Sequence, residues 1–387
     1  MLQSADTILD LYELDAEYSE EQRAIVDQVR RFVNNEVLPC IGEHHNNETF
    51  PEEILPTLKQ LGLLEAVASG DMDPITYGLI NRELERGSSA LRSILSVQGS
   101  LVMGAVSMFG SDEHKKTWLP ELGTFDKWGC FGLTEPDFGS NPSGMLTRAE
   151  KVSGGYKLNG AKSWITNATK ADMAVVWAKL DGKVRGFVVE TDRKGFEAKD
   201  IKGKWSFRAS CTGQLFMDNV EVPESALMEK STSVGSALKC LNQARYSIVW
   251  GVVGAARGCL EETVTYLKER VQFDNKPLAS HQLIQNKFAW MAAEITGMEL
   301  IAKRLSELKA KDQVKPVHVS LAKMNNCRKA IEVARTCREL MGANGIHNEY
   351  HVGRRMVDLE TVLTYEGTEH IHSLIVGQHL TGIAAYS

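Results

Sequence analysis

The spacing of apolar residues changes twice along this 387-residue chain, and that change constrains the fold more than any other feature. Over residues 19–122 apolar side chains recur three and four positions apart, which is typical of helices. Over residues 128–228 the period becomes two, as in strands, and from residue 233 onward the helical spacing returns. This order predicts an α+β fold in which a β domain lies between two helical domains. The expected domains cover residues 1–125, 126–232 and 233–387.

Local signals agree with this division. Ser19 precedes an acidic turn and an amphipathic stretch, as the capping residue of a helix does. Turn signals recur in the central region, so we expect a small antiparallel sheet there; they lie at residues 153–155, 159–160 and 181–182. Small residues dominate the run at 250–259, which would let two helices approach closely.

Composition excludes several classes of protein. A net charge of −6 argues against a general nucleic-acid binder, and no apolar run approaches the ~20 residues of a membrane span. Dinucleotide-binding, Walker A and nucleophile-elbow motifs are missing from the sequence, which disfavours Rossmann dehydrogenases, kinases and α/β-hydrolases. Seven dispersed cysteines without a CxxC pair indicate free thiols in a reducing compartment.

The beginning of the chain bears on its location. The first residues are acidic and resemble neither a secretory signal nor an Arg-rich transit peptide. We therefore expect a protein of the bacterial cytoplasm, or of the mitochondrial matrix if the source is eukaryotic and the chain is processed.

Two segments of the central region are candidates for ligand binding. The first is the loop at 129–142, which glycine and proline punctuate and whose backbone N–H groups are free to bond a ligand. In the second, Trp164 and Thr166 lie two residues apart on a strand and therefore point to the same face. Such a pair can stack on a flat ring and bond its edge. The alternative is a core tryptophan beside an edge threonine.

The third candidate is Glu366, which lies between Tyr365 and Gly367 near the end of the chain. A carboxylate flanked by aromatic and apolar residues can have a raised pKa, as a general base needs. Gly367 would let a ligand approach the backbone. The alternative is a glutamate that only caps a helix.

In order, spacing and residue type, these three segments resemble the acyl-CoA dehydrogenase family over about residues 19–385. The resemblance implies FAD as cofactor and a C-terminal four-helix bundle. It implies that Glu366 abstracts the α-proton of an acyl-CoA, while its own N–H and a flavin hydroxyl polarise the thioester carbonyl. The β-hydrogen would leave as hydride to flavin N5, to which Thr166 hydrogen-bonds.

The resemblance also implies a set of binding residues. Those expected to bind FAD are Phe131, Leu133, Thr134, Gly139, Ser140, Trp164, Ile165, Thr166, Arg270, Phe273, Gln282, Gly342, Thr368 and Tyr386. Arg270, Phe273 and Gln282 match a pattern that reaches the cofactor across a subunit interface, so we expect a homo-oligomer, most often a tetramer in this family. Ser140, Asn242 and Arg245 match the region that holds the CoA moiety.

Other segments resemble the branch of the family that oxidises glutaryl-CoA; they lie at 82–86, 91–93, 96–103 and 240–251 and in the final TGIAAYS. A substrate with a distal carboxylate needs a cation, and a guanidinium can bind a carboxylate bidentately. The resemblance therefore assigns Arg92, with Ser93, to that carboxylate. The alternative is a surface ion pair between Arg92 and Glu85 or Glu83. The expected substrate-binding residues are Arg92, Ser93, Glu85, Ser140, Asn242, Arg245 and Gly367.

Tyr365 beside the base is the residue found in decarboxylating members of the family. The resemblance thus implies Glu366, Arg92 and Tyr365 as catalytic residues, crotonyl-CoA and CO₂ as products, and electron-transferring flavoprotein as electron acceptor. One alternative is a non-decarboxylating or other short-chain acyl-CoA dehydrogenase. Another is a non-catalytic relative that binds acyl-CoA or serves in assembly.

Several positions depart from the family pattern. Asp274 stands where glycine is usual, and an acidic side chain near a pyrophosphate is unfavourable unless it points away. Ala343 replaces a glycine and would cost about 1 kcal/mol if that position has positive φ. Asn141 and Gln378 replace other usual residues, and the loop at 67–74 is short. His370 and His372 would point about 200° apart on a helix, so we expect no metal centre there.

Overall fold

The computed structural model describes residues 9–69 and 72–385, and it has the expected order of helices, strands and helices. Ser19 caps the first long helix through a capping box, because its side chain accepts from Gln22 N. The helices of the N-terminal region are α2 Glu20–Phe32, α3 Leu38–Asn47, α4 Leu55–Gln60, α5 Leu63–Ser69, α6 Pro74–Gly87, α7 Ser89–Ser96, α8 Gly104–Phe109 and α9 Asp112–Gly123.

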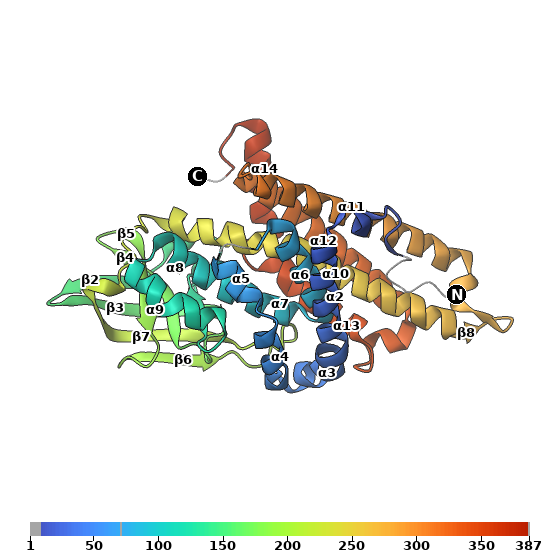
Figure 1. Cartoon of the computed structure of the whole chain (residues 1–387), viewed down its shortest axis with the longest axis horizontal. Coiled ribbons are helices and arrows are strands. Elements are labelled where there is room, and N and C mark those ends of the chain that lie inside the picture. The colour runs from blue at the N-terminus through green and yellow to red at the C-terminus, as the bar shows by residue number, and fades with distance from the viewer. Residues whose placement is uncertain (1–8, 70–71, 386–387) are drawn as a thin grey trace.

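A seven-stranded sheet follows, at one end of the molecule (Figure 1). Its strands are β1 Gly129–Gly132, β2 Arg148–Val152, β3 Gly155–Thr166, β4 Met173–Leu180, β5 Lys183–Glu190, β6 Phe196–Asp200 and β7 Thr212–Pro223. The order is β1-β4-β2-β3-β7-β6, with β5 paired to β4. Most pairs are antiparallel, as expected, but β1 pairs with β4 in parallel. The β2–β3 hairpin supplies the long crossover that a parallel pair requires.

Two of the three expected turns join neighbouring strands, at 153–154 and at 181–182. The expected turn at Asn159 and Gly160 was wrong, because both residues lie inside β3. The register against β7 shifts between Leu158 and Gly160, and Gly160 has a φ of 148°. A Cβ there would come within 2.5 Å of Thr147 Oγ1. A β-bulge and a tight turn both favour glycine, which explains the error.

The long helix α10, Val234–Glu269, packs closely against α6 because its glycines leave room. A Cβ at Gly251 would lie 2.0 Å from Glu85 Oε2, and one at Gly254 would lie 1.7 Å from the Arg82 carbonyl oxygen. This confirms the close approach expected from the small residues at 250–259. It also places Glu85 of α6 directly against the helix that carries Arg245.

The C-terminal region completes a helical bundle around α10. Its helices are α11 Gln282–Ala310, α12 Pro316–Leu340, α13 His351–Thr364 and α14 Glu369–Thr381. Between α10 and α11 a short hairpin, β8 Val271–Gln272 and β9 Lys276–Pro277, lies at the end of the molecule opposite the sheet, whereas α14 projects from the body (Figure 1).

A continuous helical stretch, Ser89–Phe109, forms the centre of the N-terminal domain. By length and mean hydropathy it could cross a membrane, contrary to the expectation from the sequence, yet 83% of its 18-residue apolar part is buried inside the protein. Its middle, η4 Val97–Met103, is a π-helix, a distortion often found at functional sites. Gln98 Oε1 accepts from Gly129 N at 2.8 Å, which ties this helix to β1. The stretch is therefore a core helix that joins two domains.

Candidate active site

The segment from Tyr365 to Thr368, here called the base loop, connects α13 to α14 in a sharp reversal. Glu366 and Gly367 both have positive φ, 53° and 96°, and such a backbone is unusual for a glutamate. A Cβ at Gly367 would lie only 3.0 Å from His372 Nε2. Thr368 is the N-cap of α14, and its hydroxyl accepts from Ile371 N at 3.3 Å. Thr368 thus performs the capping that the alternative interpretation gave to Glu366.

Two buried cations hold the base loop from neighbouring helices. Lys323 Nζ of α12 donates to the carbonyl oxygens of Tyr365 and Gly367, both at 2.9 Å. Arg245 Nε of α10 donates to the carbonyl oxygen of Glu366 at 2.7 Å. Three consecutive carbonyls are therefore bound by charged donors, which form stronger hydrogen bonds than neutral ones. These contacts fix a backbone conformation that would otherwise be strained.

The carboxylate of Glu366 is poised to accept a proton. The residue is partly exposed, but its Oε2 atom is buried and finds no hydrogen-bond partner among the described residues. Burial raises the pKa of Glu366, while the charges of Arg92, Lys323 and Arg245 act in the opposite direction. Its backbone N–H also donates to no group in the described chain, so it is available to an external acceptor.

Arg92 of α7 lies fully buried beside the base loop. Its Nε donates to Glu85 Oε2 at 2.6 Å and its Nη2 to the hydroxyl of Tyr365. Its Nη1 and the hydroxyl of Ser93 are both buried and have no partner in the parts of the chain that the structure describes. The ion pair with Glu85 thus exists, but in the interior and not on the surface. Glu85 and Tyr365 each accept one hydrogen bond from the guanidinium, which leaves Nη1 as the nitrogen without a partner in the described chain.

The loop at 131–136 is fixed to β3 by a buried ion pair that the sequence analysis missed. Lys162 Nζ donates to Glu135 Oε1 at 2.9 Å and to the Leu133 carbonyl at 3.1 Å. Ser163 N donates to the Thr134 carbonyl at 2.9 Å. Burial lowers the pKa of Lys162 to about 8. A lysine two positions before Trp164 in an otherwise half-apolar strand was the available signal.

Trp164 is 61% exposed, so the alternative of a core tryptophan was wrong. Its φ is 62°, and the register of β3 against β7 is irregular between Lys162 and Ile165. Ile165 is buried, whereas Trp164 and Thr166 on either side of it are accessible, as expected for residues that share a strand face. An exposed indole beside a hydroxyl fits a flat, polar-edged ring such as an isoalloxazine. Phe131 and Leu133 are buried, so only their backbone is suited to contact it.

The other residues expected at the cofactor lie elsewhere. Arg270, Phe273, Gln282 and Gly342 are exposed, and the β8–β9 hairpin that carries Phe273 lies at the end opposite the sheet (Figure 1). One chain therefore does not bring Phe273 and Trp164 to the same ring. Gly139 and Ser140 are exposed in the loop that follows β1. Asn242, expected to bind the CoA moiety, accepts through Oδ1 from Arg245 Nη1 at 3.1 Å. Tyr386 lies outside the described residues.

Two departures from the family pattern have structural outcomes. Gly342 and not Ala343 has positive φ, 58°, so the expected cost at Ala343 does not arise. Asp274 is exposed in the turn of the β8–β9 hairpin, where it has a φ of 53°.

His372 is buried against Ser320, with Nδ1 to Oγ at 3.1 Å, whereas His370 is exposed. The two histidines therefore do not face a common point.

Known proteins resemble this chain over nearly its whole length. Models of the N-terminal, middle and C-terminal domains of acyl-CoA dehydrogenases match residues 19–126, 130–220 and 234–381. The chain is 31% identical to a glutaryl-CoA dehydrogenase of Desulfococcus multivorans, over 96% of this chain and 99% of the relative. Two crystal structures of a glutaryl-CoA dehydrogenase from Mycobacterium smegmatis, one in complex with FADH₂, cover 100% of both chains at 46% and 44% identity, with TM-scores of 0.95 and 0.96. The chain belongs to the acyl-CoA dehydrogenase family.

Proposed function

We propose that this acyl-CoA dehydrogenase oxidises glutaryl-CoA and decarboxylates the product to crotonyl-CoA. The observation that carries the proposal is that Arg92 Nη1 and the hydroxyl of the next residue, Ser93, are both buried and have no hydrogen-bond partner among the described residues. An apolar acyl tail has no use for either group, whereas a distal carboxylate satisfies both. The names of the similar proteins, glutaryl-CoA dehydrogenases of two bacteria, support the same substrate.

The cofactor is FAD, which supplies a two-electron acceptor for the β-hydrogen. We assign its flat ring to Trp164 and Thr166, with the backbone of the loop at 131–136 alongside. Phe273 and Arg270 of a second chain would hold the distant part, because the sheet and the β8–β9 hairpin of one chain lie at opposite ends (Figure 1). An exposed Phe273 at 75% is consistent with such a contact.

Glu366 removes the α-proton in this proposal. Its buried carboxylate has the raised pKa that a base of this kind needs, and its own N–H is free to bond the thioester oxygen. Stabilising the oxygen as negative charge develops makes the α-proton more acidic. Both groups belong to Glu366, and the strained base loop holds them in fixed positions.

Decarboxylation follows from the same groups. Loss of CO₂ from glutaconyl-CoA breaks the bond between the γ-carbon and the carboxylate and leaves its electron pair in a dienolate. Protonated Glu366 then returns its proton to the γ-carbon, which gives crotonyl-CoA. Because the Tyr365 hydroxyl accepts from Arg92 Nη2, its own proton points elsewhere and is available to the substrate. The rival within the family stops at glutaconyl-CoA.

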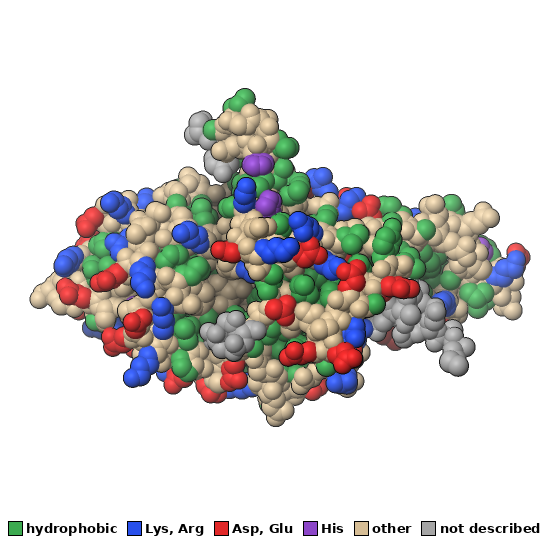
Figure 2. Space-filling model, turned by 45° about the horizontal axis from the view of Figure 1, so that its top comes forward, with side chains coloured by type: hydrophobic (Ala, Val, Ile, Leu, Met, Phe, Trp, Pro, Cys, Tyr) green, Lys and Arg blue, Asp and Glu red, His purple; other side chains and the backbone are tan. Residues whose placement is uncertain are grey.

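The proposed assembly is a homo-oligomer, by family resemblance a tetramer. Large apolar side chains are exposed on and after the C-terminal helices; they are Leu283 (82%), Leu321 (50%), Leu380 (78%) and Ile383 (71%). Figure 2 shows hydrophobic side chains gathered around the base of the projecting helix α14. A second copy would cover such a surface. Electron-transferring flavoprotein is the proposed electron acceptor, and a reducing compartment, the bacterial cytoplasm or mitochondrial matrix, suits the seven free cysteines.

The test is an anaerobic titration of the purified yellow protein with glutaryl-CoA. We expect the visible flavin absorbance to bleach, and crotonyl-CoA with CO₂ to form once an electron acceptor is added. Glu366→Gln is the matched control, since it should keep the flavin and bind substrate without bleaching; a general base contributes about 10²- to 10⁴-fold to the rate. Glutaconyl-CoA as the final product would contradict decarboxylation. A colourless protein that binds no flavin would support the non-catalytic alternative.

A further inference from the structure

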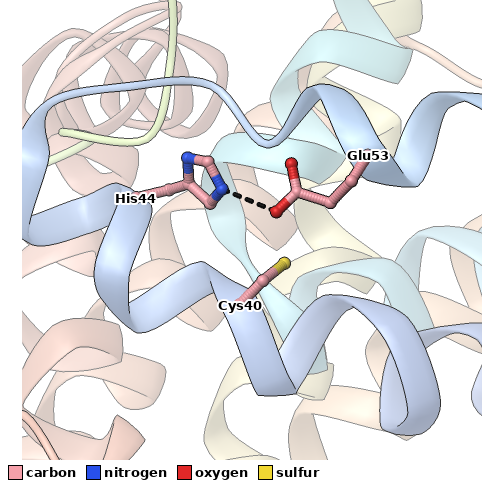
Figure 3. Close-up of side chains that lie close together, drawn as sticks. All are labelled: Cys40, His44 and Glu53. Atoms are coloured by element: carbon pink, nitrogen blue, oxygen red, sulfur yellow. Dashed lines mark hydrogen bonds and ion pairs between the residues drawn. The ribbon is translucent and has the colours of Figure 1, made fainter.

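Three side chains with metal-binding chemistry converge on the surface of the N-terminal helical domain. Cys40 and His44 are one turn apart on α3, so they share a face of the helix. Glu53 of the next element, η3 Glu52–Ile54, turns back toward that face. The sulfur, a ring nitrogen and a carboxylate oxygen all lie within 4.8 Å of one another, and Figure 3 shows the three side chains pointing toward one another.

The chemistry of these donors selects one kind of ion. Thiolate, imidazole and carboxylate together suit a borderline-soft divalent cation such as Zn²⁺, which three protein ligands bind with water in the fourth position. With ordinary Zn–S and Zn–N bond lengths, tetrahedral donors lie roughly 3.5 Å apart. The His44 and Glu53 donors are 2.8 Å apart, and no pair of donors is separated by more than 4.8 Å. Tetrahedral spacing would require the Glu53 carboxylate, whose side chain is 55% exposed, to move slightly away from His44.

His44 is also oriented as a metal ligand would be. Its Nδ1 lies 2.8 Å from Thr49 Oγ1, and its Nε2 lies 2.8 Å from Glu53 Oε1. A ligating histidine almost always hydrogen-bonds through its second ring nitrogen, which fixes the tautomer. A carboxylate facing Nε2 at this distance requires a proton or a cation between the two groups. Without a metal ion a proton on Nε2 fulfils that role.

We propose that Cys40, His44 and Glu53 bind Zn²⁺ or a cation of the same class, with water as the fourth ligand. On binding, the Cys40 thiol proton and any proton on Nε2 leave to solvent, and the ion takes their place. From the sequence no metal centre was expected at His370 and His372, and Cys40, His44 and Glu53 were not identified as candidate ligands. The signal that was passed over was the i, i+4 spacing of cysteine and histidine at the start of the chain.

The site would strengthen a contact between two domains. It closes the connection at 48–51, which joins α3 to η3. Within this connection Glu48 Oε1 accepts from Arg208 Nη1 at 2.6 Å, and its Oε2 accepts from Gly203 N at 3.1 Å. Arg208 and Gly203 belong to the loop between β6 and β7. A bound ion would therefore stabilise the interface between the N-terminal helices and the β domain.

The test uses the intact flavoprotein, which is first treated with a chelator to remove bound metal and is then supplied with either Zn²⁺ or Co²⁺. We expect one equivalent of Zn²⁺ per chain to remain after gel filtration and to raise the midpoint of thermal unfolding. Co²⁺ should give the intense d–d bands of a tetrahedral thiolate site, at wavelengths longer than flavin absorption. Cys40→Ser and His44→Gln should each lose the bands and the retained ion, whereas Cys211→Ser, which removes another partly exposed thiol, should keep both.

Two outcomes would overturn the proposal: retention of no zinc by the unaltered protein, or equal retention by the Cys40→Ser and His44→Gln variants. Bleaching by glutaryl-CoA should be the same in all of these variants, because the ligands lie outside the base loop. Failure of the metal site and failure of the proposed function are therefore distinguishable. Retained flavin colour shows that each variant has folded.

Discussion

The base loop and the cofactor surface are built in opposite ways. Around Glu366 the chain supplies its own partners, because Lys323 and Arg245 bind three consecutive carbonyls of the base loop. At the cofactor surface Trp164 and Phe273 are largely exposed and belong to parts of the molecule that lie far apart (Figure 1). The surroundings of Glu366 are thus preorganised by one chain, whereas the proposed cofactor site would need a second chain to complete it. Catalytic precision and cofactor affinity should therefore respond to different substitutions.

The electrostatics of the two regions differ as well. Lys162 of β3 and Glu135 of the loop at 131–136 form a buried pair whose charges cancel. Around Glu366, by contrast, Arg92, Lys323 and Arg245 outnumber the carboxylates, so their field opposes the effect of burial on its pKa. Burial and these three charges thus act on the pKa of Glu366 in opposite directions, which suits the proposed role of a base that later acts as an acid. Each cation can be removed separately to test the balance.

The largest effect is expected for Arg92→Gln. Leaving the distal carboxylate of the substrate without its cation costs about 3–5 kcal/mol, which corresponds to a fall in kcat/KM for glutaryl-CoA of roughly 10²- to 10⁴-fold. The ratio of kcat/KM for glutaryl-CoA to that for butyryl-CoA is the quantity to measure, because it cancels any general effect on Glu366.

Arg92→Gln also leaves Glu85 buried without its partner, so the double variant Arg92→Gln, Glu85→Gln is the control for stability. Both variants should show the same loss of preference. An unchanged substrate ranking would disprove the assignment of Arg92 to the distal carboxylate.

An intermediate effect is expected for Lys323→Met. The Lys323 charge lowers the pKa of Glu366, so its removal lets that pKa rise further. Glu366 is active as a base only when ionised, and the acid limb of kcat/KM against pH should therefore move to higher pH. The variant also leaves two carbonyls of the base loop unpaired, which should lower the free energy of unfolding by about 1–3 kcal/mol.

Lys204→Met is a matched control for Lys323→Met, since Lys204 also donates to a backbone carbonyl, that of Ile201, but outside the base loop. Its pH profile should be that of the unaltered enzyme. A Lys323→Met profile that keeps its acid limb while stability falls would show that Lys323 is purely structural.

The sequence predicted features whose signals are local. The capping of α2 by Ser19, the turn at 181–182 and the tight packing permitted by Gly251 follow from single residues and their neighbours. Glu366 and Trp164 were proposed as site residues because their segments are distinctive. The bulge at Gly160 was mistaken for a turn because both need the same backbone freedom.

Contacts between distant segments could not be predicted in this way. Lys323 lies 42 positions from Tyr365 and its side chain carries no motif, so its hold on the base loop depends entirely on how α12 packs. The division of Arg92 among Glu85, Tyr365 and an open Nη1 is likewise a property of the packed core. The sequence indicated which residues are candidates for chemistry, whereas the structure shows which of their donors and acceptors have no partner in the described chain.

The smallest effect is expected at the cofactor surface, for Trp164→Ala. Because the indole is 61% exposed, the free energy of unfolding of the flavin-free protein should change by no more than about 0.5 kcal/mol. Loss of stacking should weaken FAD binding by about 0.5–1.5 kcal/mol, measured by flavin fluorescence on titration. Trp205→Ala removes a similarly exposed indole, 65%, and should leave FAD affinity unchanged. The opposite result would be a Trp164→Ala variant that destabilises the flavin-free protein and leaves FAD affinity intact. Trp164 would then stabilise the fold and not bind the flavin, and the proposed difference between the base loop and the cofactor surface would be disproved.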